Sequence, residues 1–444
     1  MQHSKMTSSV VPIYDHSDTK AAPSMKTRLL PLFIGTALFF WLVFTTVTVF
    51  VCTTWALQTF QIGIFALLAV YLLATVRGGG TPLAPGFAPW LVYAIPLWGV
   101  FQLVEHITSS TMETRGAVLR WGALASVFFL SQVIASMQRS RRMILDVYLC
   151  FATALAVLCL LQLFTSDGLV LWLFSSGYPD VYATFASRNN YAQFVELALP
   201  VALWRAQREG WRSWWYGLSA GILYASAIGC ASRAGAVLCT AELLTLLAFG
   251  LTKLWNSEPG LPMRSTVILF MMVPFFAVLF TLATGWERTW QRFQEDDPFL
   301  GRREYIMAAM DMAKHNPLTG YGLDTFPEVY PRYAIKDFPV YVNHAHNDWA
   351  EFAADGGIPF LLLIALPFIG AIPIAIRNPW GLGLIPVMLH ACVDYPFPRP
   401  AVSGWMFAML GLLYMTRAKV LSEKTSGATP IPLVSDAGCG SAVR

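Results

Sequence analysis

Long apolar runs separated by short polar connections dominate the pattern along the chain. Runs such as Ile34 to Val51 are continuous and lack the period-two alternation of a membrane β-barrel. A helix needs roughly 20 apolar residues to cross a bilayer core about 30 Å thick. By this criterion we predict an all-α polytopic membrane protein with about twelve transmembrane helices, at 29–51, 56–76, 87–104, 116–137, 143–163, 190–205, 213–230, 234–252, 266–285, 357–376, 380–394 and 401–417.

One long polar interval, from Trp286 to Gly357, interrupts this pattern. Within it, Arg302 to His315 has helix-forming composition, and Asn316-Pro317 should end that helix because proline pushes the preceding residue out of the helical region. A second short helix is predicted from His346 to Asp355, ended by Gly356-Gly357. Because the interval gathers Arg, His, Asp and Glu between two spans, we expect it to be structured and to hold the chemistry.

Composition agrees with a membrane protein. The 444 residues are 56% hydrophobic and only 13% charged, which is far more apolar than a soluble domain of this length. The seven cysteines lie mostly in apolar runs without CxxC spacing, so they predict core residues and no disulfide framework. We therefore divide the chain into a disordered cytoplasmic tail at 1–28, transmembrane helices at 29–285, an outer catalytic loop at 286–356, further transmembrane helices at 357–417 and a second disordered cytoplasmic tail at 418–444.

Basic residues sort the connections between spans to two sides. With a cytoplasmic N-terminus and an uncleaved first span, every inner connection carries Lys or Arg, as the positive-inside rule requires: Arg77; Arg139, Arg141 and Arg142; Arg205, Arg208 and Arg212; Lys253 and Arg264; Arg377; Arg417, Lys419 and Lys424. The long polar interval then faces outward. In the outer loop from Thr165 to Asn190, the apolar patch GLVLWLF could form a helix lying in the membrane interface.

Arg233 is a candidate binding residue because it follows Ala231-Ser232 in an outer turn too short to leave the membrane surface. An arginine fixed there can hold a phosphate through two parallel charge-assisted hydrogen bonds. The alternative is an arginine that snorkels to lipid headgroups.

His344, His346 and Asp348 alternate in the sequence HAHND. On an extended segment they would line one face, as metal ligands do, but no further ligand cluster accompanies them, so no metal is predicted. On a helix, a neutral His346 imidazole could take a proton from an attacking hydroxyl near pH 7. The alternative is a hydrogen-bonded structural histidine.

Several polar residues fall within or beside predicted spans. Glu196 and Glu242 should face the bundle interior, where interhelical hydrogen bonding is favoured over ion or proton transport. Arg120 is predicted to snorkel at the outer end of its span. His390 and Asp394, four residues apart, could pair across one helical turn.

Several segments in this order resemble the O-antigen ligase and O-antigen polymerase superfamily, the bacterial membrane glycosyltransferases that use polyprenyl-pyrophosphate-linked glycans. These segments are SRNNYAQFVELALP, ASRAG, GRREYIMAAMDMAKHNPLTGYGLDTF, HAHNDWAEFAADGGIPFLLL and HACVDYPFPRPA, and the resemblance covers approximately Arg188 to Leu413. It implies a GT-C-like fold with one long, partly helical periplasmic loop, in the bacterial inner membrane. It also implies a metal-independent, inverting transfer without a cofactor.

Matching the family pattern residue by residue gives candidate site residues. The resemblance implies that Arg233 and Arg302 bind the donor pyrophosphate and that His346 assists the acceptor. Arg303 and His344 stand beside matched positions and leave a one-residue ambiguity. The residues expected to bind substrate are Arg188, Arg303, His344, Asn347 and Asp348. The expected partners are a polyprenyl-pyrophosphate-linked glycan, a lipid or glycan acceptor and membrane lipids, with no nucleic acid.

The acceptor stays open within this superfamily. A ligase acting on a lipid A core sugar is favoured, followed by an O-antigen or exopolysaccharide polymerase, and then by a protein O-oligosaccharyltransferase. A multi-pass solute transporter is the alternative from a different class, because Glu196 and Glu242 lie within predicted spans. Against it, the chain shows no inverted repeat and no matching pair of short spans broken by Gly or Pro.

Overall fold

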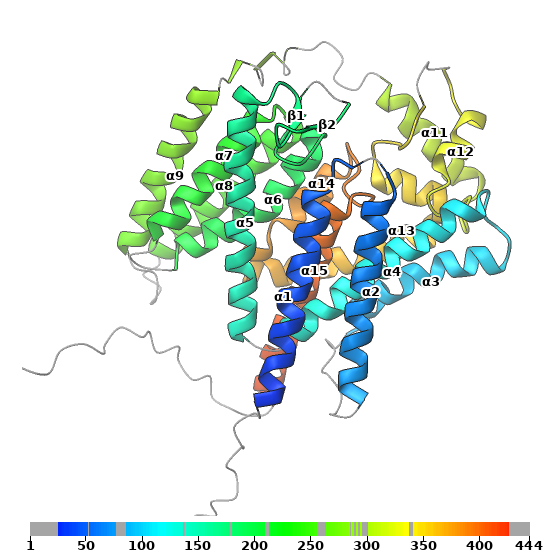
Figure 1. The fold of residues 1–444 in the computed structure, drawn as a ribbon, viewed down its shortest axis with the longest axis horizontal. Coiled ribbons are helices and arrows are strands. Elements are labelled where there is room, and N and C mark those ends of the chain that lie inside the picture. Colours follow the sequence, from blue (N-terminus) through cyan, green and yellow to red (C-terminus); the bar gives the residue numbers. More distant parts are fainter. Residues whose placement is uncertain are drawn as a thin grey trace, which may run out of the picture.

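Helices make up nearly all the regular structure in the computed structural model (Figure 1). It describes residues 25–425 except 52, 77–85, 136–137, 178–179, 209–212, 256–262, 285, 288–289, 292–293, 295–300 and 337–340. Arg77, Arg212 and most of both predicted tails lie outside the described residues. The elements are α1 (Met25–Val47), α2 (Trp55–Val76), α3 (Phe87–Val104), α4 (Thr111–Ala135), α5 (Gln138–Thr165), β1 (Leu169–Val170), β2 (Phe174–Ser175), α6 (Arg188–Ala206), α7 (Ser213–Gly229), α8 (Arg233–Trp255), α9 (Met263–Thr284), α11 (Arg302–His315), α12 (Phe326–Val329), η2 (Tyr330–Arg332), α13 (Asp348–Arg377), η3 (Pro379–Gly381), α14 (Leu384–His390) and α15 (Pro400–Thr425).

Seven helices in the described part are long and apolar enough to cross a membrane, namely α1, α2, α3, α4, α5, α8 and α13. The all-α polytopic membrane fold is thereby confirmed, whereas the count of about twelve spans stays a prediction. The span predicted at 380–394 differs most from the structure. It is divided into η3 and the seven-residue α14, which at 1.5 Å per residue is only about 10 Å long.

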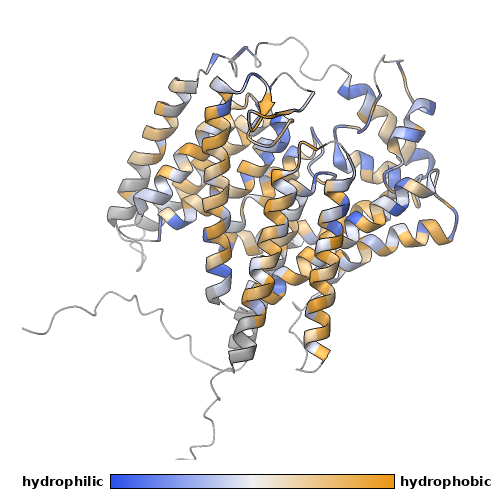
Figure 2. Ribbon diagram, viewed as in Figure 1, coloured by the Kyte–Doolittle hydropathy of each residue, from blue (hydrophilic) through white to orange (hydrophobic). Residues whose placement is uncertain are grey.

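The two ends of the described chain lie at the same end of the molecule. In Figure 1 the start of α1 and the end of α15 are at the bottom, while α11, α12 and the β1–β2 hairpin are at the top. Hydrophilic residues concentrate around α11 and α12 (Figure 2), whereas α1, α2 and α5 are largely hydrophobic. α15 runs to Thr425 and so extends into the segment predicted as a tail.

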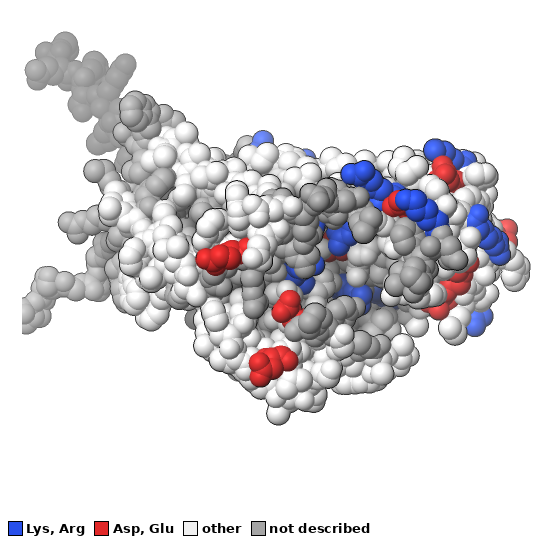
Figure 3. Space-filling view, turned by 90° about the horizontal axis from the view of Figure 1, so that it is seen from above, with Lys and Arg blue, Asp and Glu red and all other residues white. Residues whose placement is uncertain are grey.

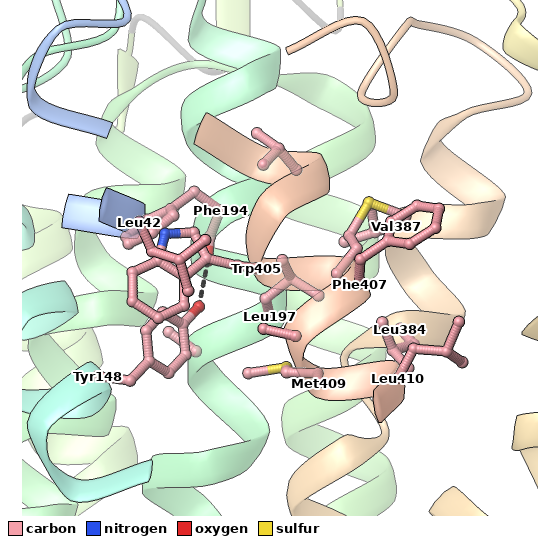
Figure 4. Close-up of a cluster of buried hydrophobic side chains, with 14 of the residues drawn as sticks. Leu42, Tyr148, Phe194, Leu197, Leu384, Val387, Trp405, Phe407, Met409 and Leu410 are labelled. Atoms are coloured by element: carbon pink, nitrogen blue, oxygen red, sulfur yellow. Dashed lines mark hydrogen bonds between the residues drawn. The ribbon is translucent and has the colours of Figure 1, made fainter. Parts of the chain in front are cut away.

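α6 lies at the centre of the bundle and is buried along almost its whole length. Figure 4 shows the apolar cluster around it, in which Phe194 and Leu197 of α6 meet side chains of α1, α5, α14 and α15. The Tyr148 and Trp405 rings are 4.4 Å apart between centroids, and the Tyr148 hydroxyl donates to the Phe194 carbonyl at 3.4 Å. The elements that carry the outer site are therefore fixed to a closely packed core.

The segment GLVLWLF forms a hairpin and not the interfacial helix that was considered. β1 pairs with β2 in antiparallel register, with Leu169 opposite Ser175. Leu171 and Trp172 adopt φ angles of +53° and +59° at the tip, which a right-handed helix excludes. Trp172, Leu173 and Phe174 remain exposed.

α13 consists of two helices that meet at the glycine pair, so the predicted end of the outer helix at Gly356-Gly357 is confirmed. It begins at Asp348, with Asn347 as N-cap, and continues to Arg377 through a kink at Gly357, where φ is +72°. Gly357 allows a close approach, since an added Cβ would lie 2.6 Å from the Leu318 carbonyl carbon. The Ile358 amide donates to the Pro317 carbonyl at 2.8 Å. The kink thus attaches the long loop to the start of a membrane helix.

A bidentate ion pair also holds the long loop on the bundle. Arg120 of α4 contacts both carboxylate oxygens of Asp324 at 2.5 and 2.6 Å, so the prediction that Arg120 snorkels was wrong. Gln102 of α3 donates to the carbonyls of Thr319 and Asp355 and accepts from the Leu323 amide. The loop predicted to be structured is therefore anchored to α3, α4 and α13.

Candidate active site

The turn between α14 and α15, residues 391–399, contacts both polar segments of the long loop. The Val393 carbonyl accepts a hydrogen bond from Nη1 of Arg302 at 3.0 Å. The Asp394 carboxylate lies 3.3 Å from Nδ1 of His346. Arg302 and His346, predicted as catalytic, are thus brought together on a turn that the sequence places about 50 residues beyond His346.

Asp348 packs against the same turn from the first position of α13. Its amide donates to the Ala391 carbonyl at 2.9 Å, and its carboxylate accepts from the Phe397 amide at 3.0 Å. The side chain is completely buried. These contacts hold the turn against the start of α13, and the binding of substrate by Asp348 stays a prediction.

His346 has a strained backbone conformation just before the start of α13. It precedes the N-cap Asn347, whose side chain accepts from the Ala350 amide at 3.0 Å, so Asn347 also serves the helix start. The φ of His346 is +54°, a left-handed conformation that costs a non-glycine residue about 1–3 kcal/mol. Its side chain is 26% exposed, so the ring is held by the protein but remains accessible.

The hydrogen bond to Asp394 fixes which imidazole nitrogen is available. An ionised carboxylate can only accept, so Nδ1 of His346 carries the hydrogen and Nε2 is left as the base. Burial alone would raise the pKa of the Asp394 carboxyl, but the His346 hydrogen bond and the neighbouring His390 and Arg302 together lower it. Asp394 therefore stays charged at neutral pH and can accept the hydrogen bond that orients the His346 ring.

His344 is held in a different way from His346. Its Nδ1 lies 2.9 Å from one Glu351 oxygen, and the Ala345 amide donates to the other at 2.7 Å. Glu351 itself is buried. The one-residue ambiguity between the histidines is thus reduced, because His346 is the one whose ring contacts Asp394, next to the Val393 carbonyl that Arg302 contacts.

The neighbouring arginines also differ. Arg302 is the first residue of α11, is partly buried and reaches the 391–399 turn, while Arg303 is exposed. Gly301 precedes them with φ of +78°, which lets the chain turn into the helix. The geometry favours Arg302 over Arg303 as the residue of the site.

Arg188 and Arg233 occupy equivalent positions in a repeated Ala-Ser-Arg sequence. Each is the first residue of its helix, α6 or α8, after a serine N-cap: Ser187 accepts from the Asn190 amide and Ser232 from the Gly235 amide. Ser232 also donates to the Asn189 side chain at 2.8 Å. The two helix starts therefore lie side by side, and their positive dipole ends and guanidiniums together favour an anion.

A buried pair connects these helix starts to the 391–399 turn. Nδ1 of His390, at the end of α14, lies 2.7 Å from the Glu196 carboxylate of α6, and neither residue is exposed to solvent. The predicted pairing of His390 with Asp394 was wrong, because Asp394 turns toward His346. The prediction that Glu196 makes an interhelical hydrogen bond is confirmed.

Charged side chains are unevenly distributed over the end of the molecule that carries α11 and α12. Figure 3 views the molecule from the upper end of Figure 1, and Lys, Arg, Asp and Glu side chains gather on the side of α11 and α12. Further basic side chains are visible in a depression near the centre of this face. Within the described residues, no group of three or more His, Cys, Asp or Glu side chains could hold a metal ion.

Comparison with known families gives this arrangement a context. Residues 218–365 match the family model described as O-antigen ligase. This match covers about a third of the chain and supports the O-antigen ligase and polymerase superfamily. No curated protein and no solved structure matches the chain. The matched segment contains Arg233, Arg302 and His346, and it supports a membrane glycosyltransferase of the ligase or polymerase type. Arg188 and the 391–399 turn lie outside it.

The sequence analysis missed the contribution of residues 391–399 to this candidate site. Asp394 was assigned to His390, and Tyr395 was not considered. The Tyr395 ring stacks on His344 with centroids 4.4 Å apart and meets His346 edge-on at 4.9 Å. The only available signal was the segment HACVDYPFPRPA, in which an acidic and an aromatic residue stand in a proline-rich outer turn.

An apolar groove lies along α8. Two cavities of about 150 and 300 Å³ share Thr245, Leu246 and Leu382 in their walls. The opposite wall comes from α14, the residues around η3 and the end of α13. Leu238, near the start of α8, and Leu389, beside His390, line the end of the groove closer to the polar site.

Proposed function

We propose that this protein is an O-antigen ligase-type enzyme that transfers a glycan from a polyprenyl-pyrophosphate donor to an acceptor hydroxyl. The reaction is inverting, needs no metal and takes place on the periplasmic side of the bacterial inner membrane. The observation that carries the proposal is the contact of His346 and Arg302 with the same turn, at Asp394 and Val393. A base and a cation are thereby held next to each other.

Each group has a defined task in the proposed reaction. The acceptor oxygen attacks the anomeric carbon while its proton moves to Nε2 of His346, and the charge of Asp394 stabilises the resulting imidazolium. The bond from the anomeric carbon to the diphosphate oxygen breaks, and its electron pair leaves with the diphosphate. Arg302, Arg233 and Arg188 bind the negative charge that develops on this leaving group.

The groove along α8 suits the lipid part of such a donor. Its walls are apolar except for Glu242, Thr245 and Thr252, and α8 begins at Arg233. A donor whose diphosphate contacts Arg233 can therefore extend its prenyl chain along the groove between α8 and α14. The head of the substrate then reaches the polar site while its chain stays in an apolar environment.

A lipid-linked or glycan acceptor is favoured, first a lipid A core sugar and then the end of a growing polysaccharide. A protein hydroxyl could react by the same chemistry, and the test below includes it as an acceptor. The transporter alternative loses support because residues 218–365 match a ligase family. A transporter should have polar groups along a path through the bundle. His346 and Arg302 instead lie in the long loop, outside the helices of the bundle.

The proposal is tested with purified protein, a polyprenyl-pyrophosphate glycan and each acceptor class, with and without a chelator. We expect a new β- or α-linked product of inverted configuration that forms equally well with the chelator present. A His346→Ala protein should lose the product while its helical content is unchanged. Absence of product from every acceptor, or loss of product on chelation, would overturn the proposed mechanism.

A further inference from the structure

Arg399 stands at the end of the 391–399 turn, immediately before α15. Its carbonyl accepts from the Val402 and Ser403 amides at 2.8 and 2.9 Å, as an N-cap residue does. Its side chain is partly exposed, and its guanidinium carbon lies 5.4 Å from the centre of the Tyr395 ring. Among the described residues, this side chain makes no hydrogen bond or ion pair.

The Tyr395 ring places Arg399 beside the two histidines. The same ring stacks on His344 and contacts the edge of His346. Arg399 is thus one aromatic ring away from the base of the proposed reaction. Stacking engages the face of a guanidinium and leaves the N–H groups at its rim available for a ligand.

The charge of Arg399 is not offset by its own helix. A cation at a helix N-terminus opposes the helix dipole, and the first turn of α15 contains no acidic residue. Three further arginines, Arg188, Arg233 and Arg302, are also the first residues of their helices, α6, α8 and α11. In α11 the first-turn Glu304 is already paired with Lys336. A substrate phosphate at Arg399 would therefore offset a charge that its own helix leaves uncompensated.

We propose that Arg399 binds a phosphate group of a substrate through its guanidinium rim while Tyr395 holds it beside His344 and His346. This inference rests on the proposed function, because it places the phosphate next to the same base. The phosphate comes either from the diphosphate of the donor or from a phosphorylated glycolipid acceptor. Both sources offer oxygen atoms that match the planar fork of donors in arginine.

Direct binding to detergent-solubilised protein distinguishes these sources. The probes are a glycan-free polyprenyl diphosphate, the polyprenyl alcohol of the same length, and a phosphorylated glycolipid with its dephosphorylated form. Arg399→Ala should weaken binding of one phosphate-bearing probe about tenfold and leave its phosphate-free counterpart unchanged. If Arg399→Ala weakens binding of the polyprenyl diphosphate, Arg399 binds the donor phosphate. If it weakens binding of the phosphorylated glycolipid, Arg399 binds the acceptor phosphate. Arg399→Lys should restore part of the affinity, because its charge remains.

Two controls separate binding from folding. Arg115→Ala removes an exposed arginine at the outer start of α4 and should change no affinity. Arg399→Gln keeps a long polar side chain in case the alanine protein unfolds. Affinities within about twofold of wild type for both phosphate-bearing probes would overturn the inference, as would wild-type protein that binds neither. Because the readout needs no transfer, wild-type protein that binds the diphosphate but forms no glycan product contradicts only the proposed function.

Discussion

The His346 imidazole and the Asp394 carboxylate are 3.3 Å apart, although 48 residues and the whole of α13 and α14 separate them in the chain. The pair joins the loop before α13 to the turn before α15. It fixes the ring of His346 and leaves Nε2 toward the site. The position of the base therefore depends on the packing of membrane helices far from it in sequence.

Replacing Asp394 with Asn should lower the transfer rate without preventing folding. An amide of the same shape keeps a hydrogen bond but no longer supplies the charge that stabilises a protonated His346. His346→Ala should cost about 10²- to 10⁴-fold in kcat, and Asp394→Asn should cost less than that. The losses in kcat are measured by steady-state kinetics of the two single variants and of the double variant. If the two losses multiplied fully in the double variant, the residues would act independently and the pair would not be a unit.

The same pair predicts a pH dependence of stability. The pKa of Asp394 is lower in the folded protein than its ordinary value, since the His346 hydrogen bond and nearby cations outweigh its burial. Its contribution is therefore fully present above the unfolded pKa of about 3.9 and is lost as pH falls through the folded pKa. The difference in melting temperature between wild type and Asp394→Asn should be present at neutral pH and narrow below about pH 4. A difference that instead widened below about pH 4 would contradict the lowered pKa.

Arg302→Lys should lose most transfer activity although the charge is retained. The guanidinium can donate to the Val393 carbonyl and still present a planar fork to a diphosphate, whereas an ammonium cannot do both in the same geometry. Arg303→Lys is the matched comparison, because Arg303 is adjacent but exposed. We expect kcat/KM for the donor to fall less in Arg303→Lys than in Arg302→Lys. Equal losses would mean that the contact with the turn does not select Arg302.

Local sequence rules predicted the local elements of the site well. The helix from Arg302 to His315 has the predicted bounds, since its composition and the Asn316-Pro317 stop act over a few residues. The short outer turn before Arg233 was also found, with Ser232 as its N-cap. These signals need no knowledge of neighbouring helices, and each positions one arginine.

Pairings between distant segments could not be predicted in this way. Helical spacing suggested that His390 and Asp394 pair, but His390 is 194 residues from its partner Glu196. Likewise, Arg120 lies where it could reach lipid headgroups, yet Asp324, 204 residues later, accepts from its two terminal guanidinium nitrogens, Nη1 and Nη2. Which carboxylate is near depends on how the helices pack, and the sequence of one segment carries no information about that.

Removing the Arg120–Asp324 pair should destabilise the docking of the long loop. The two side chains are 11% and 29% exposed, and a hydrogen bond to a charged group in such a site contributes about 1.5–3 kcal/mol. Arg120→Ala should therefore lower the melting temperature and increase proteolytic cleavage near Gly320. Lys336→Ala is the control, because its pair with Glu304 is on the surface, with Lys336 65% exposed, and such pairs contribute little. Equal effects of the two substitutions would show that the Arg120 pair does not anchor the loop.

Filling the groove along α8 should weaken binding of long-chain donors selectively. Thr245 lines both cavities and is exposed to them, so a Thr245→Trp side chain can occupy the groove without entering the packed core. The Michaelis constant should rise for a long prenyl chain and change little for a donor whose chain is too short to reach Thr245. Leu244→Trp is the matched control, since Leu244 is the neighbouring residue, is 61% exposed and lines neither cavity. If Thr245→Trp affected short and long donors alike, or if Leu244→Trp had the same effect, the chain would not lie in this groove, even if His346 and Arg302 proved essential.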